Sequence, residues 1–176
     1  MSKTTQEHKK QAPRRLRFGV FICTTSRYQA FKAGKKVKDE SGELIANLLL
    51  QTGQELAFRT LLPDDKELIQ SALKKVLDSK NVDVVVFSGG TGISPKDVTI
   101  EAVEPFMEKT LPGFGELFRW LSYEEIGSAS ILTRAFAGIA KGKVVFCIPG
   151  SPNAVKLCFE KLILPEASHI LKHSQE

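Results

Sequence analysis

The sequence is poor in the side chains that build disulfide frameworks and thiolate metal sites. It contains three cysteines among 176 residues, and no two of them have the spacing of a CxxC motif. Cys23 and Cys147 lie inside apolar runs, which is typical of small core residues in a reducing compartment. We therefore expect neither disulfides nor cysteine-bound metal.

Long apolar runs and a basic body are also missing. No apolar run approaches the ~18 residues that a membrane span needs, and no apolar signal-peptide segment precedes the first predicted strand. Residues 1–17 hold six basic residues and one acidic residue, which leaves 19 of each for the rest of the chain. The sequence thus predicts a cytoplasmic protein without a membrane or nucleic-acid partner. We expect a flexible basic tail over residues 1–15 and a single domain over residues 16–174.

Apolar runs alternate with helical patterns along the domain. Short, mostly β-branched runs predict strands over residues 16–24, 55–61, 83–88 and 143–148, while residues 128–140 are either strand or irregular. Apolar residues at helical spacing predict helices over residues 41–52, 65–79, 98–107, 114–121, 153–162 and 165–172, with a polar loop over residues 25–38. This alternation predicts a three-layer α/β fold, in which helices cover both faces of a mainly parallel open sheet.

The loops that follow the strands are where such a fold binds ligands, because the carboxyl ends of parallel strands meet at one edge. Four loops supply glycines, hydroxyl groups and aspartates: Thr24-Thr25-Ser26-Arg27, Pro63-Asp64-Asp65, Gly89-Gly90-Thr91-Gly92 with Ser94-Pro95-Lys96-Asp97, and Pro149-Gly150-Ser151-Pro152-Asn153. The three histidines, His8, His169 and His173, lie outside these loops. Their positions exclude a histidine triad or a zinc site at this edge.

We call Gly89, Gly90, Thr91 and Gly92 the glycine loop. Three glycines in four residues let backbone N–H groups approach an anion, and a helix beginning just downstream would add a favourable dipole for phosphate. Asp64 and Asp97 are carboxylates of the kind that hold Mg²⁺ beside phosphate oxygens. The loop is neither a Walker A motif nor a GxGxxG motif. We therefore expect a phosphate and Mg²⁺ site at this edge.

Several of these residues have an alternative explanation as helix caps, because caps favour the same residue types. The candidates are Asp64 with Glu67 as a capping box, Ser94 and Ser151 each before a proline, and Asp39 or Ser41 ahead of the first helix. Spacing alone leaves capping and function open at each position.

Five segments match the signature of one protein family, in the family's order. Residues 89–102 match GGTG…(R/K)DVT.EA, residues 112–119 match PGFGE, residues 131–135 match a hydrophobic-Ser/Thr-Arg segment, residues 149–154 match PG(S/N)P.A, and residues 39–42 match D.SG. The chain resembles the molybdopterin adenylyltransferases of molybdenum-cofactor biosynthesis, the MoaB/MogA family, which is related to the gephyrin G domain. The resemblance extends from about residue 18 to residue 173 and is greatest to the MoaB branch.

The resemblance implies the molybdopterin-binding fold and a Mg²⁺-dependent reaction. ATP and molybdopterin would give adenylyl-molybdopterin and pyrophosphate, and the product would then accept molybdate or tungstate on another protein of cofactor biosynthesis. The family's two important aspartates match Asp64 and Asp97, which we expect to bind Mg²⁺ and orient the phosphates. The resemblance also implies nucleotide or pterin-phosphate contacts at Ser26, Gly89, Gly90, Thr91, Gly92, Ser128, Thr133, Arg134, Gly150, Ser151 and Asn153.

Family members are trimers or hexamers, so the resemblance implies a homo-oligomer. The predicted helix over residues 114–121 agrees with this, because it has more apolar faces than one core contact needs. Its apolar residues are Phe114, Leu117, Phe118, Trp120 and Leu121.

One position departs from the family's pattern. Many members have an aspartate after the serine of the first loop, and here Arg27 follows Ser26. Two other interpretations stay open: a non-catalytic protein of the same fold that holds molybdopterin or a partner, and a hydrolase of nucleotide diphosphates, which usually has a second domain. The presence of both Asp64 and Asp97 favours the transferase.

Overall fold

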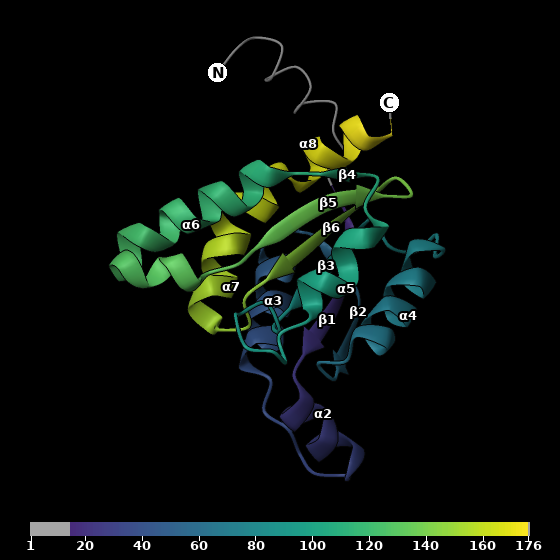
Figure 1. Cartoon of the computed structure of the whole chain (residues 1–176). Coiled ribbons are helices and arrows are strands. Elements are labelled where there is room, and N and C mark those ends of the chain that lie inside the picture. The colour runs from purple at the N-terminus through teal and green to yellow at the C-terminus, as the bar shows by residue number, and fades with distance from the viewer. Residues whose placement is uncertain (1–14, 176) are drawn as a thin grey trace.

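The computed structural model describes residues 15–175, so the predicted tail lies outside the described residues except for Arg15. The described strands form one six-stranded sheet in the order β2-β1-β3-β6-β5-β4 (Figure 1). The four parallel strands are β1 (Arg17–Cys23), β2 (Glu55–Leu62), β3 (Val84–Ser88) and β6 (Lys143–Ile148). The antiparallel strands β5 (Phe136–Ala140) and β4 (Lys109–Thr110) complete one side. The mainly parallel sheet is confirmed.

Helices cover both faces of this sheet (Figure 1). One face carries α3 (Glu40–Gln51), α6 (Pro112–Ile126), α7 (Pro152–Cys158) and α8 (Leu164–Ser174), and the other carries α4 (Lys66–Leu77) and α5 (Thr99–Val103). Strand side chains alternate between the two core clusters, so Val20 and Ile22 of β1 join the first and Phe21 joins the second. The three-layer α/β fold predicted from the sequence is confirmed.

The prediction of a polar loop over residues 25–38 is wrong for the first half of this segment. This part is helix α2 (Thr25–Lys32), which buries none of its residues and so has no apolar stripe by which the sequence would reveal it. A distant residue supports its start instead. The carboxylate of Asp64 accepts a hydrogen bond from the Thr25 N–H at 2.8 Å, which satisfies one of the donors left open at a helix N-terminus.

The segment over residues 98–140 differs most from the prediction. The helix expected over residues 98–107 is only α5 followed by the 3₁₀ turn η1 (Glu104–Phe106), which contains Pro105. The two-residue strand β4 then follows without having been predicted. α6 extends beyond residues 114–121 at both ends, and residues 128–140 divide between the 3₁₀ helix η2 (Gly127–Leu132) and β5.

The two helices predicted at the C-terminus are continuous. A π-helical turn, η3 (Phe159–Ile163), joins α7 to α8. Pro165 lies in the first turn of α8, a position where proline is tolerated.

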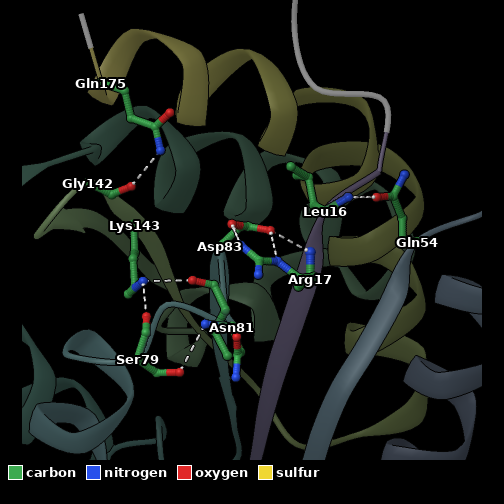
Figure 2. Close-up of polar contacts among 10 residues, drawn as sticks. Leu16, Arg17, Gln54, Ser79, Asn81, Asp83, Gly142, Lys143 and Gln175 are labelled. Carbon is green, nitrogen blue, oxygen red and sulfur yellow. Dashed lines mark hydrogen bonds and ion pairs between the residues drawn. The ribbon is translucent and has the colours of Figure 1, made fainter.

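Charged side chains join the amino ends of the parallel strands (Figure 2). The Arg17 guanidinium donates to Asp83 through Nε at 3.0 Å and Nη2 at 2.7 Å, and the Arg17 backbone N–H donates at 2.9 Å. Lys143 is buried, and its Nζ donates to the carbonyl oxygens of Ser79 and Val82, both at 2.7 Å. These contacts fix the edge of the sheet at which the parallel strands begin. The loops described below lie at the opposite edge, where these strands end.

Candidate active site

The loops after the parallel strands meet at the carboxyl edge of the sheet. The N–H of Thr24, after β1, donates to the carbonyl of Leu62 in β2 at 2.8 Å. The N–H of Gly89, after β3, donates to the carbonyl of Ile148 in β6 at 2.9 Å. The predicted convergence of these loops is therefore confirmed.

Asp64 joins the loop after β2 to the start of α2. Its Oδ2 accepts hydrogen bonds from the backbone N–H and the hydroxyl of Thr25, both at 2.8 Å. The capping explanation for Asp64 is wrong, because the cap of α4 is Asp65, which accepts from the Leu68 N–H. Asp64 is therefore held in place by Thr25, a partner that the sequence analysis did not identify. The only sequence signal for it was a hydroxyl residue directly after the first strand.

The glycine loop is tightly packed against the chain itself. Gly89 has a φ of +104°, and a Cβ there would lie 2.3 Å from the carbonyl oxygen of Cys23. A Cβ on Gly90 would lie 2.5 Å from Thr99 Oγ1 and 2.9 Å from Asp64 Oδ1. The hydroxyl of Thr99 also donates to the Gly89 carbonyl at 2.9 Å. Glycine is thus required by internal packing as well as by any close approach of an anion.

Asp97 closes a turn beside the same loop. Its Oδ2 accepts from the Ser94 N–H at 2.9 Å and lies 2.8 Å from where a Cβ on Gly92 would be. Its own N–H donates to the Ser94 carbonyl at 2.8 Å. The explanation of Ser94 as a helix cap is wrong, because α5 begins only at Thr99 and has Val98 at its N-cap position. The helix dipole expected just downstream of the glycine loop is therefore limited to a five-residue helix.

Arg134 supports the glycine loop from the other side. Its Nε donates to the Thr91 carbonyl at 2.8 Å, and its Nη1 and Nη2 donate to the two carboxylate oxygens of Glu101 at 2.6 and 3.1 Å. The hydrogen bond to Glu101 raises the pKa of Arg134, and the same bond lowers the pKa of Glu101. Three of the five N–H groups of Arg134 are thus engaged, which leaves two for a ligand. Glu101 belongs to the signature over residues 89–102, and the structure gives it a role in orienting Arg134.

Part of this set lines a pocket of about 330 Å³, whereas Asp64 is not in its lining and lies beside it, near Gly90. Its lining consists of Gly89, Gly90, Thr91, Gly92, Asp97, Leu132, Thr133, Arg134, Pro149 and Gly150. Asn153 instead lines a separate hollow with Lys156 and Glu160, while Ser26, Ser128 and Ser151 are exposed outside both. Ser151 caps α7 by accepting from the Ala154 N–H. The structure thus brings part of the predicted set together and leaves these four residues at its margin.

Arg27 lies against Asp39. Its Nη1 is 3.7 Å from Asp39 Oδ1, while Arg59 Nε lies 3.6 Å from Asp39 Oδ2. Asp39 also caps α3 by accepting from the Gly42 N–H at 3.0 Å. In the same turn, the Ser41 hydroxyl donates to the Gly150 carbonyl at 2.7 Å. The cation that replaces the family's aspartate is therefore paired within the chain, beside a turn that contacts the pocket.

No cysteine side chain lines this pocket. Cys23, Cys147 and Cys158 are free and buried, as predicted. Burial raises the pKa of the Cys23 thiol to about 12, so this side chain stays protonated beside the glycine loop.

Residues 15–175 contain neither a membrane-spanning helix nor a preformed cluster of metal ligands. Within this range, no helix has the length and apolar character required to span a bilayer. The same range holds no group of three or more histidine, cysteine, aspartate or glutamate side chains arranged around a metal position. A metal at the candidate site would therefore rest on two carboxylates and on oxygens of its substrates.

Comparison with known proteins gives relatives along almost the whole chain. The family described as a probable molybdopterin binding domain matches residues 21–169. Molybdenum cofactor biosynthesis protein B of Bacillus cereus is 46% identical over 165 residues, covering 93% of this chain and 94% of that protein. The molybdopterin adenylyltransferase of Pyrococcus furiosus is 45% identical over 175 residues, covering 97% and 98%.

The solved structures give the same result. The tungsten cofactor synthesizing protein MoaB from Pyrococcus furiosus superposes with a TM-score of 0.82 at 44% identity, covering 94% of this chain and 100% of that chain. A crystal structure of a molybdenum cofactor biosynthesis protein B superposes with a TM-score of 0.83 at 42% identity, covering 94% and 99%. The chain therefore belongs to the molybdopterin-binding MoaB/MogA family of molybdenum-cofactor biosynthesis.

Proposed function

We propose that this protein is a Mg²⁺-dependent molybdopterin adenylyltransferase. A terminal phosphate oxygen of molybdopterin forms a bond to the α-phosphorus of ATP, and the bond from that phosphorus to the β-phosphate oxygen breaks, so pyrophosphate leaves. The observation that carries the proposal is the convergence of Asp64 and Asp97, from different loops, on Gly90 and Gly92 of one glycine loop. The relative from Pyrococcus furiosus, a molybdopterin adenylyltransferase by name, supports the same reaction.

The two carboxylates are the residues that would hold Mg²⁺. Mg²⁺ binds through one or two carboxylates together with phosphate oxygens, so this oxygen-only donor set fits it. When bound, the ion supplies neutralisation of charge on the phosphates. Thr25 donates hydrogen bonds to one carboxylate oxygen of Asp64, and the Ser94 N–H donates to one carboxylate oxygen of Asp97. These bonds keep both side chains oriented toward the glycine loop.

The remaining residues of the pocket position the substrates. Arg134 has two unengaged N–H groups beside Thr91, and a guanidinium suits phosphate oxygens. Thr133 and Gly150 line the same pocket, and Ser41 holds Gly150 from the side of α3. Phosphoryl transfer of this kind needs positioning and charge stabilisation, which these groups supply without a covalent intermediate.

An exposed apolar strip supports assembly into a homotrimer or hexamer. Leu117, Trp120, Tyr123 and Ile126 of α6 are each more than half exposed, while Phe118 of the same helix is buried in the core. Large apolar side chains gathered on one helix are typical of an interface between chains. The assembly and the cytoplasmic location stay predictions. So does the hand-over of the product to a protein that inserts molybdate or tungstate.

The proposal is tested by replacing each aspartate with asparagine, which removes the negative charge and keeps the shape of the side chain. We expect Asp64→Asn and Asp97→Asn to fold normally, because an amide oxygen still accepts the hydrogen bonds of Thr25 or Ser94. Each should lower adenylyl transfer by roughly 100-fold or more. Asp65→Asn is the matched control: it alters the adjacent carboxylate, Asn caps helices as well as Asp, and activity should be unchanged.

The assay follows pyrophosphate and adenylylated pterin from molybdopterin, ATP and Mg²⁺. Equal amounts of both products from the wild type, with loss in the two variants, are the expected result. Wild-type turnover in both variants would remove the Mg²⁺ assignment. Tight pterin binding by the wild type without turnover would instead identify a non-catalytic molybdopterin-binding protein, and Arg27 would be the first position to revert to aspartate.

A further inference from the structure

The last helix carries two histidines at the edge of the sheet away from the candidate active site. His169 and His173 lie four residues apart in α8, so they share one helix face. The adjacent Gln175 side chain donates to the carbonyl of Gly142, in the turn before β6, at the amino edge of the sheet (Figure 2). The glycine loop follows the carboxyl end of β3, so the histidines lie remote from the chemistry proposed above.

The tautomer of His169 is fixed by its neighbour. Its Nδ1 lies 3.2 Å from Glu166 Oε2. A carboxylate only accepts hydrogen bonds, so Nδ1 carries the proton and, in the neutral ring, Nε2 presents its lone pair. The carboxylate–histidine pair is the arrangement that orients metal-binding imidazoles in proteins.

The ring nitrogens of the two histidines face each other across a hydrogen bond, in which Nε2–H of His173 donates to Nε2 of His169. Nε2 of His169 and Nε2 of His173 are 3.1 Å apart. Metal–imidazole bonds of about 2.0–2.1 Å, at angles between square and tetrahedral, place two nitrogens about 2.8–3.4 Å apart. The observed separation lies inside this range, so a metal ion can take the place of the proton between the two nitrogens, with neutral His173 then carrying its proton on Nδ1. His173 is exposed, so a metal ion can reach its ring from solvent.

We propose that His169 and His173 chelate one divalent transition-metal ion of the kind that favours imidazole, such as Zn²⁺ or Ni²⁺, with Glu166 orienting His169. The site is separate from the Mg²⁺ site formed by Asp64 and Asp97, which has only oxygen ligands. Imidazole nitrogen selects transition metals, whereas carboxylate and phosphate oxygens suit Mg²⁺. The imidazole pair therefore discriminates against Mg²⁺, whereas the carboxylate site must be kept occupied by excess Mg²⁺ during the test.

The test is calorimetric titration of the full chain with Zn²⁺, repeated with Ni²⁺, in a large excess of Mg²⁺ that occupies the carboxylate site. We expect one ion bound per chain. His173→Gln and His169→Gln should each weaken binding by at least about tenfold. His8→Gln is the control, because it removes a histidine of the N-terminal segment and should leave the affinity unchanged.

Adenylyl transfer is measured on the same proteins. His173→Gln should retain wild-type transfer while it loses Zn²⁺, so failure of this site and failure of the proposed function are distinguishable. Absence of Zn²⁺ and Ni²⁺ binding by the wild type would overturn the proposal. Wild-type affinity in both histidine variants, or equal loss in His8→Gln, would overturn it as well.

Discussion

Replacement of Gly89 by alanine tests how the glycine loop is built. A Cβ at this position would lie 2.3 Å from the Cys23 carbonyl oxygen, which is backbone of the central strand β1 and has no rotamer to change. The loop cannot shift easily either, because the Gly89 N–H is bonded to Ile148 and its carbonyl to Thr99. Gly53 provides a matched control, since its φ is +71° and a Cβ there would meet nothing within 4 Å.

The expected cost has two parts. A left-handed backbone costs a non-glycine residue about 1–2 kcal/mol, and this applies to both variants. Forced overpacking adds about 1–3 kcal/mol, and this applies only at Gly89. Gly53→Ala should therefore lower the free energy of unfolding by about 1–2 kcal/mol, and Gly89→Ala by about 2–5 kcal/mol.

Urea unfolding at equal protein concentration measures both values, because a concentration difference would shift the stability of any oligomer. Losses that agree within about 0.5 kcal/mol would show that the contact with Cys23 carries no cost. The packing argument for the glycine loop would then fail. A larger loss at Gly89 should be accompanied by reduced adenylyl transfer, since Thr99 and Gly90 move with the loop.

Two further predictions concern the opposite edge of the sheet. Burial raises the pKa of Asp83, but the hydrogen bonds and charge of Arg17 and the charge of Lys143 lower it more, so the pKa lies below the ordinary value of an aspartate. The stabilisation that ionised Asp83 gives the folded protein is therefore complete above the unfolded-state pKa and is lost as the pH falls through the folded-state pKa. Urea unfolding across the acid range should show a weaker pH dependence of stability in Asp83→Asn than in the wild type. An unchanged pH profile in this variant would refute the role given to Asp83. Lys143→Met leaves the carbonyls of Ser79 and Val82 without their donor and should cost roughly 1–3 kcal/mol. The surface variant Lys141→Met, which loses only an exposed pair with Asp78, should cost about 0–1 kcal/mol, and equal losses would contradict the role given to Lys143.

Much of the fold was predictable because hydrophobic periodicity is a local property. The runs that became β1, β3 and β6 are almost wholly buried strands, and the apolar stripe of α4 matches its buried residues Ile69, Leu73 and Val76. Short segments without such a pattern were mispredicted. α2 buries no residue, and β4 has only two residues, both exposed. Their structure depends on neighbours that are distant in the sequence.

The candidate site divides in the same way. The sequence by itself determined that glycines, hydroxyls and two aspartates follow parallel strands, and hence that they gather at one edge. Only the tertiary structure decided which pairs form, because the bonds join residues far apart in the chain: 39 positions for Thr25 with Asp64, 43 for Arg134 with Thr91, and 109 for Ser41 with Gly150. Residue type makes Asp64 equally suited to a cap, a metal ligand or a clamp on α2. The choice between these roles belongs to the packing of one loop against another, which no local pattern encodes.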